Sequence, residues 1–481
     1  MTTDRERTGP AWGTFLELES SAGGPLHTRL TRALRTAVAS GRLAAGSTLP
    51  ASRVLAADLR CSRWVVTEAY AQLVAEGYFE ARSGSATRVR AHAGTDAVRG
   101  GAREGGDRWT PRFDLLPGVP DLRAFPRKRW ADRVRAATTE LTWDELGYPD
   151  AAGLPRLRRQ LASYLARGRG ARVDPGQLVV CARTLDAVMR LCRSLRAAGH
   201  THVAVEDPGW TQLRLTVAAA GLTPAAIPVD EHGLRVDVLR EAPDVRAVIV
   251  APAHQFPTGV VLAPARRAEP ADWAREVDGL VMEDDYDAEF RYDRHPVGAL
   301  QGVAPEHVAL LGSLSKTLSP AVRLGWIAAP ERWTAALTTK DTGGTPPPVI
   351  GQDAFTRFVS SGSYDRHLRA SRLRYKRRRD HLLCELAARL PGQAVGGAAA
   401  GFHLLLPLED CPAGAVVEEA ARADVRLASL DDYRAAEATA DTPATSTLVV
   451  GYGNLTDQAV PGAVQRLARA IERVRAGEHG H

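Results

Sequence analysis

The sequence predicts an α/β protein in two parts: a small basic module of three helices and a β-hairpin, followed by a large domain built on a parallel sheet. Its 481 residues suffice for two to four domains of about 100–200 residues each. Hydrophobic residues make up 44% of the chain and charged residues 25%, which is typical of a folded globular protein. After residue 110, short apolar runs alternate with helical patterns, as they do in α/β domains.

Hydropathy and cysteine content exclude several classes of protein. No stretch approaches the roughly 18 uninterrupted apolar residues of a membrane helix, and MTTDRERTGP lacks the apolar core of a secretory signal. The five cysteines form no CxxC pair, so we expect neither a disulfide framework nor a zinc site. The sequence therefore predicts a cytoplasmic protein without a metal centre.

The positive charge of the chain is concentrated near its amino terminus. Between Pro25 and Arg90, ten arginines stand against four acidic residues, and this excess of six equals the formal net charge of the whole chain, +6. The rest of the sequence is therefore close to neutral. Such a local excess is the electrostatic footprint expected of a segment that binds a polyanion.

The spacing of apolar residues predicts the elements of this basic segment. Leucines four residues apart indicate a helix over 26–40, LPASRVLAADL indicates a second, short helix, and a third begins at about Ser62. GYFEARSGSATRVR then predicts two short strands. Three helices and a basic hairpin form a winged helix-turn-helix, whose third helix enters the major groove of DNA. The alternative is that the arginines only solvate a helical bundle; their coincidence with a tight helix-turn-helix favours DNA binding.

A linker separates the two parts. Residues 91–110, AHAGTDAVRGGAREGGDRWT, are rich in glycine and alanine and show no apolar period, which indicates a flexible connection. We therefore expect a DNA-binding domain over residues 14–90, a linker over 91–111 and a large domain over 112–475.

In the large domain, four apolar runs each end in a polar cluster. They are HVAVEDPGW, AVIVAPAHQFPTG, GLVMEDDYDAEF and VALLGSLSKTL. The carboxyl ends of parallel strands form the ligand crevice of an open α/β sheet. We therefore expect the following side chains to converge there: Asp207, His254, Asp284, Tyr286 and Lys316.

These residues suggest a cofactor. A lysine that follows a strand and is flanked by hydroxyl groups can form a Schiff base with an aldehyde, if desolvation lowers its pKa. Pyridoxal phosphate also needs a carboxylate for its ring nitrogen, a donor to its phenolate and an anion cradle. Candidates for these roles, in that order, are Asp284, Tyr286 and the group Ser313, Ser315 and Arg323. Taken singly, an SK pair is usually solvated, and a DD pair more often caps a helix or binds magnesium.

Both parts resemble known families. The segment 25–89, with its PL start, LPASR, AYAQLVAEGY and GSAT, resembles the winged-helix domain of GntR-type bacterial repressors. EDDYDAEFRY, HPVGALQG and GSLSKTLSPAVRLGW resemble the core of fold-type I aminotransferases, specifically the aminotransferase-like domain of MocR-type (GabR-like) transcriptional regulators. The resemblance covers about residues 14–90 and 112–475, and this fusion is itself diagnostic. It implies a winged helix-turn-helix joined to a large PLP-dependent transferase-like domain.

The resemblance assigns roles in DNA binding. Gly84 would bring the wing close to the duplex. Four residues would contact phosphates or bases: Arg53, Ser62, Arg63 and Tyr70. Two positions depart from the family pattern. Arg60 stands where a turn glycine is usual, and Val65 where threonine is usual.

The resemblance also assigns roles around the cofactor. Lys316 would form the internal aldimine, Asp284 would pair with the pyridine nitrogen, Tyr286 would bond the phenolate oxygen and Arg323 would hold the phosphate. Tyr148, in LGYPD, would reach the phosphate of the other subunit. This implies a homodimer, with DNA-binding modules exchanged between subunits.

Some cofactor positions depart from the family. Arg183 and Asp186 stand where the phosphate loop usually has glycine and glutamine, so that Arg183 could bind the phosphate or block the loop. Trp210 replaces the usual tyrosine of EDPGY and keeps an aromatic face. The stretch 448–452 contains no arginine where aminotransferases hold the substrate carboxylate.

Three functions remain in competition. The leading hypothesis is a regulator that binds pyridoxal phosphate and in which cofactor or effector chemistry changes how a dimer presents its winged helices to double-stranded DNA. The second is a genuine aminotransferase with an accessory DNA-binding module, and the third is a regulator whose pocket no longer binds the cofactor. The missing arginine predicts poor transamination and favours amines without an α-carboxylate, or pyridoxal phosphate itself, as effectors.

Overall fold

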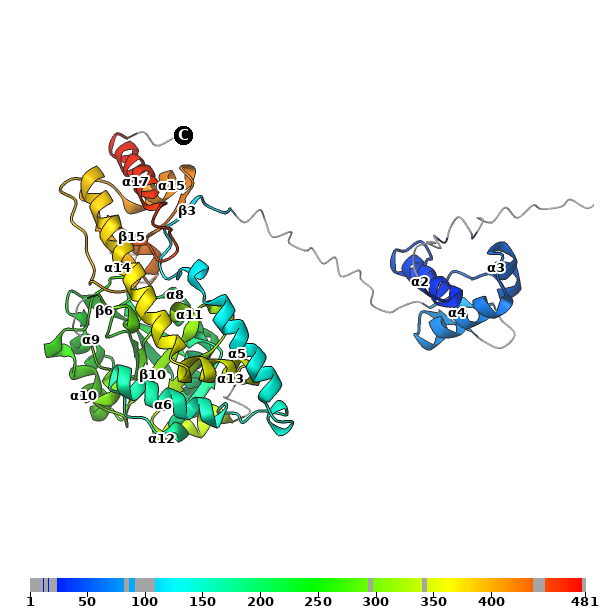
Figure 1. The fold of residues 1–481 in the computed structure, drawn as a ribbon, viewed down its shortest axis with the longest axis horizontal. Helices are drawn as coiled ribbons and strands as arrows, with labels where there is room; N and C mark the ends of the chain where they lie inside the picture. Colours follow the sequence, from blue (N-terminus) through cyan, green and yellow to red (C-terminus); the bar gives the residue numbers. More distant parts are fainter. Residues whose placement is uncertain are drawn as a thin grey trace, which may run out of the picture. The chain divides into compact units, whose positions relative to one another are not determined.

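A computed structural model describes residues 12, 16, 24–81, 86–90, 109–292, 297–339, 344–435 and 446–477. The chain divides into two compact units, residues 1–109 and 110–481, which we describe one at a time (Figure 1). Among the described residues, no helix has the length and apolar character needed to cross a bilayer.

The small unit is a winged helix-turn-helix, as the apolar spacing predicts. Its helices are α2 (Leu26–Ala39), α3 (Ser52–Asp58) and α4 (Arg63–Ala75), and strands β1 (Phe79–Glu80) and β2 (Arg88–Val89) pair antiparallel. The apolar faces of the helices meet in one core with members such as Leu30, Leu34, Leu55, Val66 and Leu73. Arg82 and Gly84, at the expected tip of the hairpin, lie outside the described residues.

The large unit contains an eight-stranded sheet in the order β4-β11-β10-β9-β8-β5-β6-β7. In that order its strands are Leu178–Cys181, Gly325–Ala328, Val308–Ser313, Leu280–Asp284, Val245–Val250, His202–Asp207, Thr223–Asp230 and Gly233–Leu234. The five strands from β10 to β6 run parallel, whereas β11 is antiparallel to both of its neighbours. The four apolar runs of the sequence are β5, β8, β9 and β10, which lie side by side, so this expectation is confirmed.

Helices cover both faces of the sheet. Leu310 of β10 packs in a core shared with α6 (Pro155–Arg169) and α13 (Val349–Ser360), whereas its neighbour Leu311 packs in a core shared with α7 (Thr184–Ala197). Successive strand residues point to opposite faces. The sheet is therefore buried on both sides, which explains its nearly continuous apolar strands.

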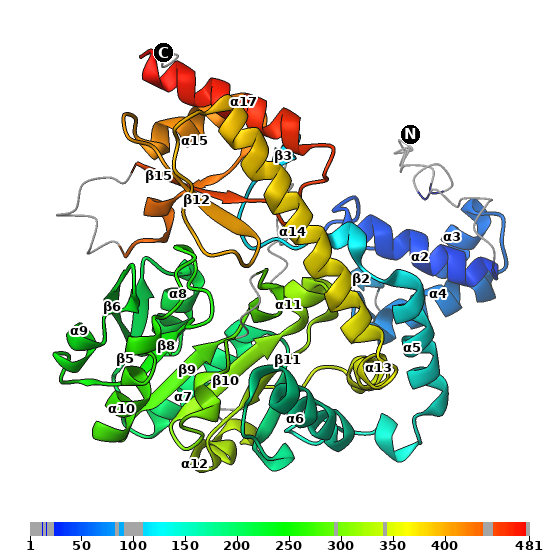
Figure 2. The same ribbon diagram turned by 60° about the vertical axis from the view of Figure 1, so that its left-hand side comes forward.

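A smaller sheet follows near the carboxyl end. Strands β12 (His403–Pro407), β15 (Thr447–Gly451) and β14 (Ala428–Ser429) form it, with α15 (Ala413–Arg422) and α17 (Val460–Arg475) packed nearby. The long helix α14 (Ser363–Arg389) runs from α13 to α17, as Figure 2 shows. It therefore connects the region of the large sheet with that of the small one.

Candidate functional site

A cavity of about 260 Å³ opens at the carboxyl ends of β9 and β10. It is lined by residues that follow these strands, by the start of α7 and by the loop after β5. Seven of the residues assigned to the cofactor line it: Arg183, Trp210, Asp284, Tyr286, Ser313, Ser315 and Lys316.

Lys316 lies in the single-turn helix α11 (Leu314–Thr317), directly after β10. Its Nζ donates a hydrogen bond of 2.5 Å to the carbonyl of Gly118. Gly118 has φ +79°, and a Cβ there would lie 3.3 Å from the amine, so glycine keeps this approach open. Burial lowers the pKa of Lys316, although Asp284 and Asp287 oppose the shift. The lowered pKa favours the neutral amine, which is the nucleophilic form.

Asp284 is the last residue of β9 and is buried. Burial raises its pKa to about 7, the neighbouring Asp285 adds to the rise, and Lys316 opposes it. Its Oδ1 is buried and has no hydrogen-bond partner among the described residues. A buried carboxylate oxygen without a donor is costly, and here it belongs to a residue that lines the cavity. It therefore fits a ligand that supplies a donor, as a protonated ring nitrogen does.

Tyr286 is supported by a buried histidine. Its Oη lies 3.0 Å from Nδ1 of His254, and that nitrogen lies 2.9 Å from Oδ2 of Asp287. The rings of His254 and Tyr286 are stacked, with centroids 6.0 Å apart. Burial raises the pKa of Tyr286 well above its usual range, and Asp287 adds to the rise, so the hydroxyl stays protonated and can donate. His254 thus lies behind the cavity wall and positions Tyr286.

The amino terminus of α7 forms the anion end of the cavity. Arg183 precedes the helix, and Thr184 and Leu185 of its first turn line the cavity with it. Backbone N–H groups at a helix start attract anions. Arg183 has φ −174°, an extended conformation that any residue adopts, so the missing glycine does not strain the loop. Its side chain is exposed, whereas Asp186 accepts from the Ala182 N–H and pairs with Arg190.

Three of the expected residues do not line the cavity. His254 lies behind its wall, and Asp207 and Arg323 lie elsewhere in this chain. Oδ1 of Asp207 accepts a hydrogen bond of 2.7 Å from the backbone N–H of Ala435 and lies 3.7 Å from Nη1 of Arg214. The expectation that Asp207 joins the crevice is therefore wrong, because its carboxylate binds the backbone at Ala435, just after the 3₁₀ helix η9 (Leu430–Tyr433). Arg323 is exposed, at φ +55°, and does not line the cavity.

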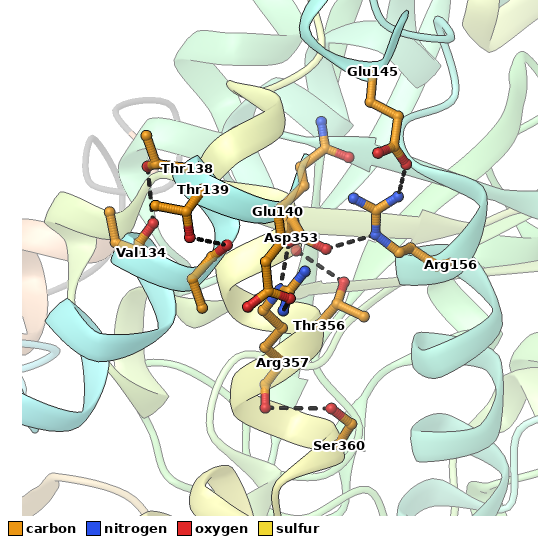
Figure 3. Close-up of polar contacts among 12 residues, drawn as sticks. Val134, Thr138, Thr139, Glu140, Glu145, Arg156, Asp353, Thr356, Arg357 and Ser360 are labelled. Carbon is orange, nitrogen blue, oxygen red and sulfur yellow. Dashed lines mark hydrogen bonds and ion pairs between the residues drawn. The ribbon is translucent and has the colours of Figure 1, made fainter. Parts of the chain in front are cut away.

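Tyr148 is fully exposed and does not line the cavity of its own chain. Its loop is nevertheless held by ion pairs (Figure 3). Arg156 of α6 pairs with Glu145 in the loop and with the buried Asp353 of α13, and Asp353 also accepts a hydrogen bond of 2.6 Å from Arg357. An exposed aromatic side chain on a loop that is fixed in place suits contact with another molecule, because tyrosine is enriched at interfaces.

Other lining residues were missed by sequence reasoning. Gly118 and Phe256 contribute to the cavity wall. Gly118 lies in FDLLPGVPDLRAFPRKRW and Phe256 in HQFPTG, two further stretches that resemble the MocR-type aminotransferase-like domain. The proline and glycine turn in the first stretch was the available signal for Gly118.

In the small unit, the expected DNA contacts separate into two groups. Arg53, Ser62 and Arg63 are exposed at the starts of α3 and α4, and Nε of Arg63 lies 3.3 Å from Oγ of Ser52. Tyr70 is only 8% exposed, and its hydroxyl donates to the carbonyl of Pro50. Tyr70 therefore stabilises the core, and we leave it out of the proposed DNA contacts.

Family comparisons agree with this geometry. Residues 122–427 match aminotransferase class I and II, and residues 26–89 match bacterial regulatory proteins of the gntR family. The large unit therefore belongs to the class I and II aminotransferase family, and the small unit is a gntR-type module.

Two curated relatives match over most of the chain. The HTH-type pyridoxine biosynthesis transcriptional regulator PdxR of Corynebacterium glutamicum is 32% identical over 448 residues, which cover 92% of this chain and 95% of that protein. The probable rhizopine catabolism regulatory protein MocR of Rhizobium meliloti is 33% identical and covers 76% and 78% respectively. The chain thus belongs to the MocR-type family of transcriptional regulators, as its motifs predict.

Solved structures share the fold of the large unit. An archaeal alanine:glyoxylate aminotransferase superposes with a TM-score of 0.68 at 22% identity, over 77% of this chain and 92% of its own. The aspartate aminotransferase of Thermus thermophilus with maleate gives a TM-score of 0.64 at 23% identity, over 76% and 93%. These matches confirm the aminotransferase fold.

Proposed function

We propose that this protein is a DNA-binding transcriptional regulator whose large unit binds pyridoxal phosphate and responds to the cofactor or to an amine. The observation that carries the proposal is the combination, in one chain, of a basic winged helix-turn-helix and a cavity that holds Lys316 beside the unpartnered Oδ1 of Asp284. Relatives named as regulators of pyridoxine biosynthesis and rhizopine catabolism support the same function.

The cavity residues fit pyridoxal phosphate in three ways. Lys316 offers an amine of lowered pKa, Asp284 offers a buried acceptor, and the start of α7 offers unshared N–H groups close to Ser313 and Ser315. When bound, the cofactor supplies an aldehyde that amines can join and a ring that withdraws electrons. Tyr286 can donate to a phenolate oxygen, and Trp210 gives the cavity an aromatic wall.

The exposed Arg183 is well placed to add a cation at the anion end of this cavity. We favour binding of the phosphate over blockage of the loop, because the backbone there is unstrained. Arg323 stays a prediction as a second phosphate ligand.

Reduction of the purified protein with borohydride, followed by peptide mapping, tests the cofactor assignment. We expect the adduct on Lys316 and a visible absorption band before reduction. The variant Lys316→Ala should show neither, while Lys340→Ala, a matched lysine substitution, should show both. An adduct on Lys128, Lys340 or Lys376, or none, would contradict the assignment.

We further propose that the protein is a homodimer in which Tyr148 reaches the cavity of the partner subunit. The support is the exposure of Tyr148 and Trp143 on a loop that ion pairs fix in place. Chains carrying Lys316→Ala and chains carrying Tyr148→Ala should each bind the cofactor weakly. Mixing the two should restore one complete cavity per mixed dimer, and failure of this rescue would exclude the shared site. The exchange of DNA-binding modules between subunits stays a prediction.

The alternative function is genuine transamination, which the intact Lys316, Asp284 and Tyr286 set favours. Against it, Leu448, Val449 and Val450 of β15 are fully buried and apolar where a carboxylate-binding arginine is expected. Poor orientation of the substrate can cost about 100-fold or more in rate. Turnover of a common α-amino acid at about 1 s⁻¹ or faster would contradict the proposal that the large unit binds its ligand without efficient catalysis, and would favour the enzyme.

A further inference from the structure

The first turn of α4 carries a tryptophan that folding does not require. Trp64 is 61% exposed, whereas Val66, Ala69, Tyr70 and Leu73 form the buried face of the same helix. A large apolar side chain left open to water gives up the free energy that its burial would provide. A contact with another molecule would recover that free energy, as tryptophan often does at interfaces.

The indole of Trp64 is held in place by His27 of α2. The two rings meet edge to face, with centroids 5.4 Å apart and an interplanar angle of 70°. This contact reduces the rotamer freedom that Trp64 would otherwise lose on binding a partner, so the side chain is partly preorganised. His27 therefore acts as a positioning residue for Trp64.

The neighbours of Trp64 indicate which partner it meets. Arg63 precedes it, and Nε of Arg63 lies 3.3 Å from Oγ of Ser52 at the start of α3, where Arg53 is also exposed. In a winged helix-turn-helix, the amino-terminal residues of the third helix contact base edges in the major groove. The guanidinium groups favour the DNA phosphates or a guanine edge. The indole of Trp64, next to Arg63 in the first turn of α4, adds a large apolar surface that suits an apolar feature of a base edge.

We propose that Trp64 reads the C5-methyl group of a thymine in each half-site, with His27 holding the indole toward it. The proposal rests on the DNA-binding function proposed above. The thymine methyl is the one apolar group that base pairs present in the major groove, and apolar side chains recognise it by contact. Trp64 thereby discriminates thymine from cytosine at this position, which Arg53 and Arg63 cannot do by charge.

The test begins with a duplex selected from a random library by the full-length protein. Each thymine of the selected site is then replaced by deoxyuridine, one at a time, so that only the methyl group is lost. We expect one position per half-site at which the wild-type affinity falls about fourfold, the value of one buried methylene-sized group. Trp64→Ala should bind the unmodified duplex more weakly and lose no further affinity at that position.

Two variants complete the experiment. His27→Ala should reduce the loss caused by deoxyuridine at the same position, because a less constrained indole makes a poorer contact. Val74→Ala, at the partly exposed far end of α4, serves as the control and should behave like wild type. If Trp64→Ala keeps the full deoxyuridine effect at every thymine, the methyl contact is excluded while DNA binding stands. A full-length protein that selects no duplex would instead overturn the proposed function, and this inference with it.

Discussion

Arginine serves opposite purposes in the two units. In the small unit, Arg32, Arg53, Arg60 and Arg90 are exposed and form no ion pair with another described residue, whereas Arg35 pairs with Glu76. In the large unit, many arginines are bound to carboxylates. Two of these arginines, Arg169 and Arg378, are themselves buried, and Arg156 and Arg357 share the buried Asp353 (Figure 3). The difference shows that net charge alone says little. What marks a surface for a polyanion is cationic groups that the protein itself leaves without acidic partners.

The buried arginines of the large unit contribute to its stability through the carboxylates that they neutralise. Arg378 is 2% exposed, and its guanidinium donates to Asp121, Asp457 and the carbonyl of Gly453. These contacts tie α14 to the segment at Asp121 and to the loop after β15. Arg169 bonds Asp285 in the same way beside the cavity.

The largest effect should come from breaking one of these buried pairs. Arg378→Met removes the buried cation from Asp121 and leaves it only Arg123, whose side chain is largely exposed. This should destabilise the large unit by up to about 3–5 kcal/mol in urea unfolding. Its neighbour Arg377 pairs with the same Asp457 but its side chain is 69% exposed, so Arg377→Met should cost less than about 1 kcal/mol. If the two variants lose the same free energy of unfolding, burial does not determine how much each arginine contributes to stability.

The next largest effect should appear in the small unit, on DNA affinity. Arg63→Ala should cost about 1–3 kcal/mol in binding if this side chain reads a base edge. Arg53→Ala should weaken binding to all sequences and reduce the slope of log affinity against log salt by about 1. Fluorescence anisotropy at several salt concentrations measures both. Arg475→Ala, which removes an exposed arginine paired with Asp410, is the control and should change neither quantity.

The extent of sequence prediction follows from what a local pattern can encode. Four apolar runs ending in polar clusters predicted β5, β8, β9 and β10, because adjacent parallel strands end at the same edge of a sheet. Asp207 was misplaced because its partner, the N–H of Ala435, is 228 residues away, and no local pattern reveals such a pairing. For Tyr70, the family resemblance suggested a DNA contact, whereas its spacing from Val66, Ala69 and Leu73 places it on the buried face of α4.

The two units also differ in their acids, which gives a third test: a hydrogen bond with Arg35 lowers the pKa of Glu76 in the small unit, whereas burial raises the pKa of Glu283 in the large unit. Glu283 of β9 is fully buried, and burial raises its pKa to about 7, with Asp285 adding to the rise. The folded protein therefore retains a proton that the unfolded chain loses near the ordinary value of 4.5. The stabilisation by this group is complete at acid pH and is lost as pH rises toward about 7.

The measurement is the unfolding temperature of the large unit between about pH 5 and pH 8. Glu283→Gln should flatten the decline with rising pH and stabilise the protein by on the order of 1–3 kcal/mol at the alkaline end. The slope that remains should reflect Glu206, Asp284 and Glu289, whose pKa values burial also raises. Glu276→Gln, at a largely exposed carboxylate on α10 (Glu269–Glu276), should leave the pH profile unchanged. A wild-type profile in Glu283→Gln would show that this carboxyl is ionised in the folded protein.

The smallest effect concerns Arg60, an exposed arginine of the small unit whose backbone conformation is unfavourable. Arg60 occupies the turn between α3 and α4 at φ +51°, a left-handed conformation that costs a residue with a Cβ about 1 kcal/mol and glycine almost nothing. Arg60→Gly should therefore slow local hydrogen exchange in α3 and α4 by the equivalent of about 0.5–1 kcal/mol.

DNA affinity of the same variant should fall slightly at low salt, because one exposed cation is lost. Arg60→Ala removes the same charge but keeps the Cβ, so it should weaken DNA binding equally without the gain in protection. If Arg60→Ala protects the helices as much as Arg60→Gly does, the gain comes from reduced repulsion among the arginines. The left-handed backbone conformation of Arg60 would then not be the source of the cost.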